Sequence, residues 1–398
     1  MDPQVVEWIN LNVKWIHLIV GIAWIGASFY FNWLEGNLER NKPGLNKGVA
    51  GDLWAVHGGG FYHVEKFENA PEKLPDILHW FKWEAYLTWI TGFAMMILVF
   101  YLAPSIYLID ASVSNISPGT AIAISLGSML FGWLIYDQLC KTKLSENGML
   151  FFWIIFLSLT LLAYVLTHLI SAKAAYIHVG AVIGTIMVAN VFFGIIPSQK
   201  KMVAAMKKGE IPDPIVGKRG FQRSLHNNYF TLPVLFIMLS GHYPLTFGSE
   251  YSWLVLAAIA LIGVFVRHYF NLKNRGQNKV WMLPLAALLM ATLAYLTMPK
   301  SNDNSAQITT VNYATIAPVI EQRCMSCHAT KPTNMAFKTA PKGIVLETKG
   351  DLEKEADSVY AQTVTTHAMP IGNLTKMTAE ERTLLANWYK TFKSKTSQ

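Results

Sequence analysis

The chain has 398 residues, of which 52% are hydrophobic and only 15% charged, and its formal net charge is +8. Charged residues lie mainly between long apolar runs, which is the profile of a polytopic membrane protein. The positive charge does not alternate with aromatic residues on a soluble surface, so the sequence excludes a nucleic-acid-binding protein.

Apolar runs long enough to cross a bilayer recur along the first 299 residues. A hydrocarbon core of about 30 Å takes roughly 20 apolar residues per helix. We predict eight spans, at 8–34, 77–103, 120–139, 148–170, 172–196, 228–247, 251–271 and 280–298. The first lacks the basic residues that precede a cleaved signal peptide, so it should be a retained helix. The expected fold is therefore all-α, with residues 1–299 forming a polytopic membrane helix bundle of about eight transmembrane helices.

Lysine and arginine are divided unevenly between the two sides of this bundle. The connections at 35–76, 140–147, 197–227 and 267–279 hold 5, 2, 7 and 4 of them. On the other side, residues 1–7, 104–119 and 244–250 hold none, and the turn at 171–173 holds only Lys173. Basic loops stay in the cytoplasm. We therefore expect a multi-pass protein of a bacterial inner membrane, surrounded by lipid, with both termini in the periplasm.

Nine of the histidines precede residue 300. Ionisable residues within membrane spans are costly and are therefore functional candidates. The predicted topology places one group in the outer half of the bundle, at His17, His168, His178 and His242. A second group lies on the inner side, at His57, His63, His79, His226 and His268.

Two stretches, 15–31 and 176–192, begin alike, with an aromatic residue, an isoleucine and a histidine. They suggest a repeat of four helices plus four, in which His17 and His178 face each other; chance similarity between two apolar helices is the alternative. Two neutral imidazoles from different helices can hold a b-type haem. We predict haem b between these two residues, with the other two outer histidines as alternative ligands. The other explanation is that each histidine bonds to a neighbouring helix.

A short motif near the C-terminus, "RCMSCHATKPT" at 323–333, carries a specific chemical signature. Cys324, Cys327 and His328 form the Cys-x-x-Cys-His pattern, in which both thiols attach haem c covalently and the imidazole binds its iron. A redox pair or a zinc site is the alternative, but zinc would need two further ligands and only His367 is nearby. Haem c is attached on the periplasmic side in bacteria, so the motif agrees with the predicted orientation.

The residues around this motif resemble a small class I cytochrome c. We place a linker at 300–311 and the cytochrome c domain at 312–398. A first helix is expected at 313–328, and a last helix at 377–392 should begin with a capping box of Thr378 and Glu381. The apolar stripe of that last helix is Leu384, Leu385, Trp388 and Tyr389.

A second axial ligand for the haem c iron is expected between these two helices. A methionine thioether opposite the histidine raises the reduction potential, which suits an electron acceptor. Met369, followed by Pro370, resembles the ligand loop of class I cytochromes c and is our first choice. Met377 is the alternative, and either methionine can instead fill the core.

The opening "VKWIHLIVGIAWIGASFYFNWLE", the eight spans and the fused cytochrome c together resemble, over nearly the full length, the bacterial membrane-bound, cytochrome c-linked urate oxidases, or urate hydroxylases. This resemblance implies oxidation of urate to 5-hydroxyisourate. It further implies that electrons leave through the cytochrome to a respiratory oxidase or a soluble cytochrome, without hydrogen peroxide. The shorter stretch "KWIHLIVGIAWIGA" is also similar to membrane protoporphyrinogen oxidases and copper-resistance membrane proteins.

Urate is a planar anion near neutral pH, so its site should offer a fixed cation, aromatic rings and a base. The candidate catalytic residues on the inner side are Arg267, His268, His79, His57 and His63. Arg267 can alternatively be a topology anchor that extends to the membrane interface. Two other functions stay open, namely a haem-bearing electron-transfer subunit and a quinol or porphyrinogen dehydrogenase.

Overall fold

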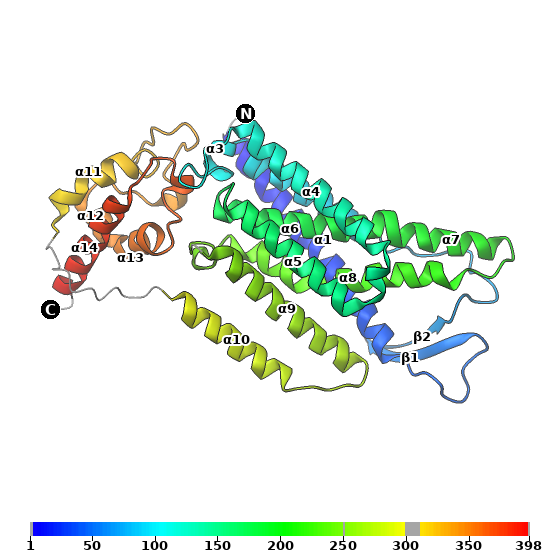
Figure 1. Ribbon diagram of the computed structural model, residues 1–398. Helices are drawn as coiled ribbons and strands as arrows, with labels where there is room; N and C mark the ends of the chain where they lie inside the picture. Colours follow the sequence, from blue (N-terminus) through cyan, green and yellow to red (C-terminus); the bar gives the residue numbers. More distant parts are fainter. Residues whose placement is uncertain (1–2, 250, 299–310, 397–398) are drawn as a thin grey trace.

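The computed structural model describes residues 3–249, 251–298 and 311–396, and it is mostly helical (Figure 1). A bundle of long helices makes up most of the molecule, and a smaller helical unit formed by the C-terminal residues lies beside one end of it. The short helix α3 (Pro104–Tyr107) lies next to that unit. The long helices are α1 (Pro3–Asn37), α2 (Trp83–Met96) with a π-helical extension (Ile97–Tyr101), α4 (Pro118–Cys140), α5 (Gly148–Thr167), α6 (Ala172–Ala189), α7 (Ile196–Lys207), α8 (Pro214–Ser240), α9 (Ser252–Asn274) and α10 (Met282–Thr297).

Six helical segments are long and apolar enough to cross a membrane. They are Gln4–Asn37, Trp83–Tyr101, Pro118–Cys140, Gly148–Thr167, Ala172–Lys207 and Ser252–Asn274. The other two predicted spans also fall on helices, but the first half of α8 is polar and α10 has only 16 residues. The structure is thus consistent with a helical membrane protein, with six segments rather than eight that meet both criteria among the described residues.

Several helix boundaries differ from the prediction. Helix α8 begins at Pro214, well before residue 228, because the Asp213 side chain accepts a hydrogen bond from the backbone N–H of Ile215 at 2.9 Å and proline suits the first helical position. Residues 77–82 lie outside helix α2, so His79 precedes the helix instead of lying at its inner end. His242 likewise lies in the turn after α8 and not within a helix.

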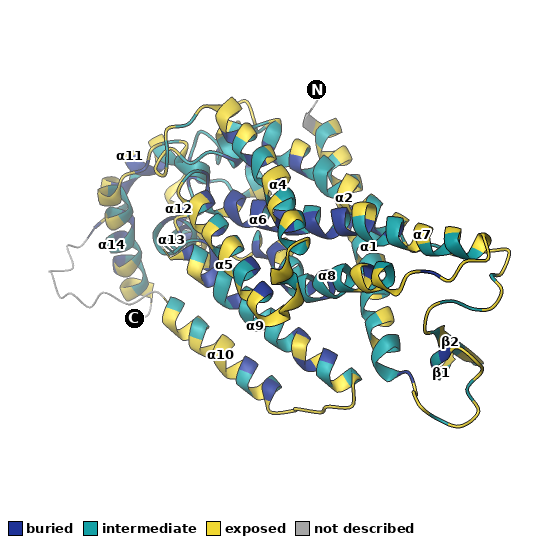
Figure 2. Ribbon diagram, turned by 45° about the vertical axis from the view of Figure 1, so that its right-hand side comes forward, coloured by how far each residue is buried: buried dark blue, intermediate teal, exposed yellow. Residues whose placement is uncertain are grey.

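Helix α6 forms the centre of the bundle and is buried along most of its length (Figure 2). Small residues allow its neighbours to approach closely, as is common between membrane helices. A Cβ atom on Gly180 would lie 2.5 Å from Cγ2 of Ile237 in α8, so only glycine fits there. Helix α6 continues through a π-helical turn (Asn190–Ile195) into α7, which together make one segment of 36 residues.

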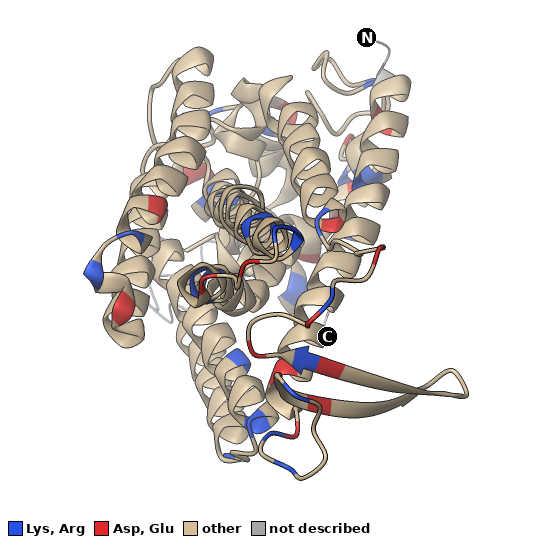
Figure 3. Cartoon of the chain, turned by 90° about the vertical axis from the view of Figure 1, so that its right-hand side faces the viewer, with Lys and Arg blue, Asp and Glu red and all other residues tan. Residues whose placement is uncertain are grey.

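A β-hairpin interrupts the otherwise helical chain and was not predicted. Strands β1 (Val49–His57) and β2 (Gly60–Phe67) pair antiparallel, and Gly58 and Gly59 between them both have positive φ, as a two-residue hairpin turn requires. The hairpin lies at the end of the bundle opposite the C-terminal unit (Figure 1). Figure 3 faces this end, where Lys and Arg lie on the hairpin and the connections around it.

The C-terminal unit contains α11 (Tyr313–Arg323), α12 (Lys349–Lys354), α13 (Ala356–Tyr360) and α14 (Ala379–Thr396). Its capping box is confirmed, since Thr378 N–H donates to Glu381 Oε2 at 2.8 Å and Glu381 N–H donates to Thr378 Oγ1 at 3.3 Å. The predicted apolar stripe of α14 packs into the core of the unit. Of the predicted linker at 300–311, only Val311 lies within the described residues.

Candidate functional site

The Cys-x-x-Cys-His motif lies directly after α11, where the chain turns. The Cys324 carbonyl accepts hydrogen bonds from the backbone N–H groups of Cys327 and His328, at 3.1 and 2.9 Å. The His328 Nδ1 lies 2.9 Å from the carbonyl oxygen of Ile344. When Nδ1 donates to that carbonyl, Nε2 is left as the ligand nitrogen, which is how metal-binding histidines are usually oriented.

The thiol chemistry of the motif does not favour a redox pair. Burial, with the neighbouring Cys327 and Glu381, raises the pKa of Cys324 to about 12. Reactive Cys-x-x-Cys pairs instead have a depressed thiol pKa. No group of three His, Cys, Asp or Glu side chains that could hold a metal ion occurs among the described residues, so a zinc site has no support there.

Both candidate methionines line the same cavity as His328. Met369 is held by its backbone, since its N–H donates to Gln362 O at 2.9 Å and its carbonyl accepts from Arg382 Nη1 at 2.8 Å. Met377 is buried in the same hydrophobic core of the C-terminal unit as Cys324. Two thiols, an oriented imidazole and a thioether around one cavity are a donor set that fits haem c.

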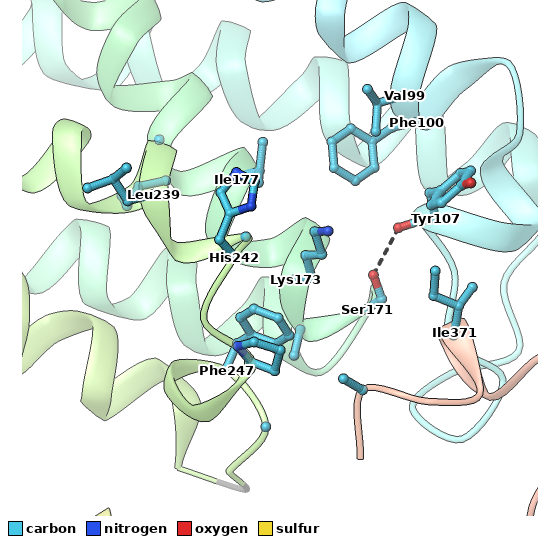
Figure 4. Close-up of a pocket in the computed structure, with 18 of the residues that line it drawn as sticks. Val99, Phe100, Tyr107, Ser171, Lys173, Ile177, Leu239, His242, Phe247 and Ile371 are labelled. Atoms are coloured by element: carbon cyan, nitrogen blue, oxygen red, sulfur yellow. Dashed lines mark hydrogen bonds between the residues drawn. The ribbon is translucent and has the colours of Figure 1, made fainter. Parts of the chain in front are cut away.

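This cavity extends from the C-terminal unit into the helix bundle and has a volume of about 1680 Å³ (Figure 4). Single small-molecule pockets are usually about 300–1,000 Å³, so it is large enough for more than one group. The two parts of the molecule are in close contact beside it. The carbonyl of Gly372 accepts from the N–H of Ala111 at 3.4 Å, and a Cβ atom on Gly372 would lie 2.5 Å from Ile109 O.

Three of the four outer histidines line this cavity. His17 is buried on α1, and its Nδ1 lies 2.9 Å from Thr91 Oγ1. His168 and His242 lie in the turns that follow α5 and α8. His178 is fully buried and does not line the cavity. Its Nδ1 lies 2.7 Å from Ala174 O, and its Nε2 has no partner among the residues that the structure describes.

The five inner-side candidates are not brought together, and none of them lines the cavity. His57 lies at the tip of the hairpin, and His79 lies in the segment before α2. His63 Nε2 lies 2.8 Å from Asp52 Oδ2, and hydrogen bonds from Lys42 and His63 lower the pKa of Asp52. The hairpin histidines are therefore separate from the residues on α9.

Arg267 and His268 are adjacent on α9 but have different surroundings. Arg267 is only 5% exposed, its Nε donates to Asn228 Oδ1 at 3.0 Å, and its guanidinium lies 4.1 Å from the centre of the Phe29 ring. Its Nη2 has no partner among the described residues. His268 is exposed, and its Nδ1 lies 2.8 Å from the hydroxyl of Tyr229.

A buried polar network around the start of the π-helical turn (Asn190–Ile195) was not predicted. Asn190, where the π-helical turn begins, donates from Nδ2 to Tyr136 Oη at 2.9 Å and accepts from Arg223 Nη1 at 2.9 Å. Arg223 Nη2 also donates to Asp137 Oδ1 at 2.8 Å, and Tyr136 Oη lies 2.7 Å from His226 Nδ1. A π-helical turn often marks a functional site. The hydropathy of the sequence does not predict where this π-helical turn and its polar network lie.

Basic side chains of the cavity were also missed as site residues. Lys14, Lys173 and Lys342 line it and come from α1, α6 and the C-terminal unit. One signal in the sequence could have identified Lys173. Lys173 is the one basic residue in the connections on its side of the bundle, because residues 1–7, 104–119 and 244–250 contain no Lys or Arg.

Comparison with known proteins gives one match. A family model described as urate oxidase N-terminal matches residues 3–298, which is most of the chain and ends before the Cys-x-x-Cys-His motif. No curated protein and no solved structure shows significant similarity to the chain.

Proposed function

The chain belongs to the urate oxidase N-terminal family, and from that premise we propose that it is a membrane enzyme that oxidises urate to 5-hydroxyisourate. Membership of this family indicates that the chain is an oxidoreductase whose reaction is related to urate oxidation. The finer proposal is the cytochrome c-linked type, located in a bacterial inner membrane with the C-terminal unit in the periplasm. Its electrons would pass to a respiratory oxidase or a soluble cytochrome, without hydrogen peroxide.

The proposal assigns the C-terminal unit to haem c. Cys324 and Cys327 would carry the thioethers, and His328 with Met369 would bind the iron, with Met377 as the alternative. When bound, haem c accepts electrons one at a time. The described side chains support this assignment by their chemistry and by lining one cavity.

One observation carries the proposal, namely that the haem-motif residues and the bundle residues line a continuous cavity. A substrate in the bundle part of that cavity would have no wall of protein between it and the cytochrome. Conversion of urate and water to 5-hydroxyisourate releases two protons and two electrons, and the water oxygen becomes the hydroxyl group at C5. Because haem c takes one electron at a time, two successive one-electron transfers would carry both electrons from urate to the cytochrome.

Haem b in the bundle is a further part of the proposal. His17 with His168 or His242 is the pair that the cavity favours, because His178 does not line it. Gly21, Gly26 and Gly184 also line the cavity, and a Cβ atom on any of them would meet no atom of the described residues within 4 Å. Such open, small-residue walls leave room for a flat macrocycle between helices.

The test uses membranes that contain the full-length protein, kept without oxygen, with oxidised soluble cytochrome c as acceptor. Wild-type protein should consume urate and reduce two acceptor molecules per urate. Cys324→Ser with Cys327→Ser should insert normally but lose this reaction. If the double variant still reduces the acceptor with urate, or if a parallel assay in air shows that it oxidises urate with formation of peroxide, the cytochrome-linked proposal is wrong. Reduction by quinol but not by urate would instead favour an electron-transfer subunit.

A further inference from the structure

The charges that line the cavity are strongly unbalanced. Among the residues that the structure describes, five basic side chains line it against a single carboxylate, Asp110, whose Oδ1 accepts from Ser112. The basic residues are Lys14, Lys173, Arg323, Lys342 and Arg382. A cleft lined by one sign of charge with low-dielectric walls concentrates ions of the opposite sign.

The two arginines are already engaged. Arg323 pairs with Glu381, with Nη2 and Oε1 2.9 Å apart, and Arg382 donates to the carbonyls of Met369 and Thr363. The three lysines have neither a hydrogen bond nor an ion pair with any residue that the structure describes. They are therefore the cations that are free to bind an anion.

Lys173 is the best placed of the three. It lies near the start of α6, where the Ser171 hydroxyl donates to Tyr107 O at 3.0 Å and ties that helix to α3. Figure 4 shows its amine directed into the space bordered by His242, Phe100 and Tyr107. Lys14 and Lys342 line the same cavity as Lys173, and like charges that share one cavity repel one another. An anion among the three amines would relieve this repulsion.

The walls beside these lysines suit a flat heterocycle. Phe100, Tyr107 and Phe247 line this part of the cavity, and aromatic rings pack well against planar ligands. The Tyr107 hydroxyl adds a hydrogen-bonding group. The haem-motif residues Cys327 and His328 line the same space.

We infer that this outer part of the cavity binds the urate anion, with Lys173 as its principal cation. The inference rests on the proposed function and adds the position of the substrate. Urate would then bind at the end of the bundle that carries the C-terminal unit, far from Arg267 and the hairpin histidines. In the predicted orientation this is the periplasmic side, so the substrate need not cross the membrane before it reacts.

The test measures binding of urate to the full-length, dithionite-reduced protein in detergent by equilibrium dialysis, because the reduced protein cannot oxidise the ligand. Lys173→Gln should weaken urate binding about tenfold or more, since a charge-assisted hydrogen bond is lost. Lys173→Arg should bind within about threefold of wild type, because the charge is kept. Lys201→Gln, on the exposed surface of α7, is the matched control and should bind like wild type.

Haem c content and midpoint potential of each variant complete the test. An unchanged potential with weakened urate binding supports the inference and shows that the variant is folded. Unchanged urate binding in Lys173→Gln overturns it. Unchanged binding with a shifted potential also overturns it, because the lysine would then serve a haem propionate. Loss of binding in an Arg267→Gln variant but not in Lys173→Gln would place the substrate at the inner end. If wild-type protein neither binds urate nor is reduced by it, the proposed function itself fails.

Discussion

At the scale of single residues, two methionines compete for one position in the cavity of the C-terminal unit. Met369 lies in a loop that its backbone hydrogen bonds hold in place, whereas Met377 is part of the apolar core. Met369→Ala should abolish the methionine-to-iron charge-transfer absorbance and lower the midpoint potential, because the thioether that favours the ferrous state is lost. Met377→Ala should destabilise the unit but keep the absorbance. The reverse pattern in the visible spectra would identify Met377 as the ligand.

The ion pair between Arg323 and Glu381 links the haem-motif end of α11 to α14. Burial raises the pKa of Glu381, but hydrogen bonds from Arg323 and from the Thr378 backbone outweigh it, so the pKa is lowered overall. A carboxyl whose pKa is lower in the folded state stabilises the fold above its unfolded pKa, and this contribution is lost as the pH falls through its folded pKa.

Glu381→Gln should therefore lower the stability of the C-terminal unit by about 1.5–3 kcal/mol at neutral pH, and the difference should shrink below about pH 4. Thermal denaturation of the full-length protein, followed by the methionine-to-iron absorbance, measures this. Glu353→Gln is the control, because Glu353 lies 3.5 Å from exposed Lys349 and should matter little. A difference between Glu381→Gln and wild type that does not depend on pH would contradict the assignment.

Site residues were predictable where the chemistry is local in sequence. The spacing of Cys324, Cys327 and His328 is enough to indicate haem c attachment. The capping box is likewise predicted from two residues three positions apart, Thr378 and Glu381. The proposed role of Lys173 in anion binding could not be predicted in this way. It depends on the tertiary structure, in which α1 and the C-terminal unit bring two more lysines to the same cavity. The structure does not bring the five inner-side catalytic candidates together, and this could not be predicted for the same reason. Hydropathy predicts how deep a residue lies in the membrane but not which helices are neighbours.

At the scale of elements, the polar network around Asn190 is the feature that hydropathy could not reveal. Asp137 and Arg223 are 14% and 12% exposed at their side chains and are 2.8 Å apart. Asp137→Asn should destabilise the bundle by about 3–5 kcal/mol, because it leaves a buried guanidinium without its counter-charge. Thermal unfolding of the purified protein in detergent measures the loss.

Lys141→Gln is the matched control, since Lys141 pairs with the same carboxylate at 2.6 Å but is 61% exposed. Exposed pairs contribute about 0–1 kcal/mol, so this variant should unfold close to wild type. Equal losses in both variants would show that the network does not depend on the buried pair.

Helix positions were predictable from apolar runs, but helix ends were not. The Asp213-Pro214 pair is a clear start signal for α8, yet the polar residues that follow hid it from a hydropathy count. The hairpin was equally hidden, although Gly58 and Gly59 between two β-forming stretches are a recognised turn signal. Both lie in connections, where local turn chemistry outweighs periodicity.

At the scale of the whole molecule, the cavity that joins the bundle to the C-terminal unit is the basis for the haem b proposal. His17→Ala should remove non-covalent haem while leaving covalent haem c, as counted by pyridine haemochrome analysis. His178→Ala should retain the non-covalent haem, because this histidine lies outside the cavity lining. A wild-type preparation with one haem per chain, all covalent, would show that the bundle histidines serve packing or proton transfer.

The central claim is that urate supplies electrons to the C-terminal haem c within one chain. Rapid mixing of the purified, fully oxidised protein with urate in the absence of oxygen tests it most directly, with haem c absorbance as the signal. Haem c should be reduced, and at limiting urate two haem groups, haem c and non-covalent haem counted together, should be reduced per urate consumed. A haem c that stays oxidised with urate, in a preparation that dithionite reduces completely, would contradict it.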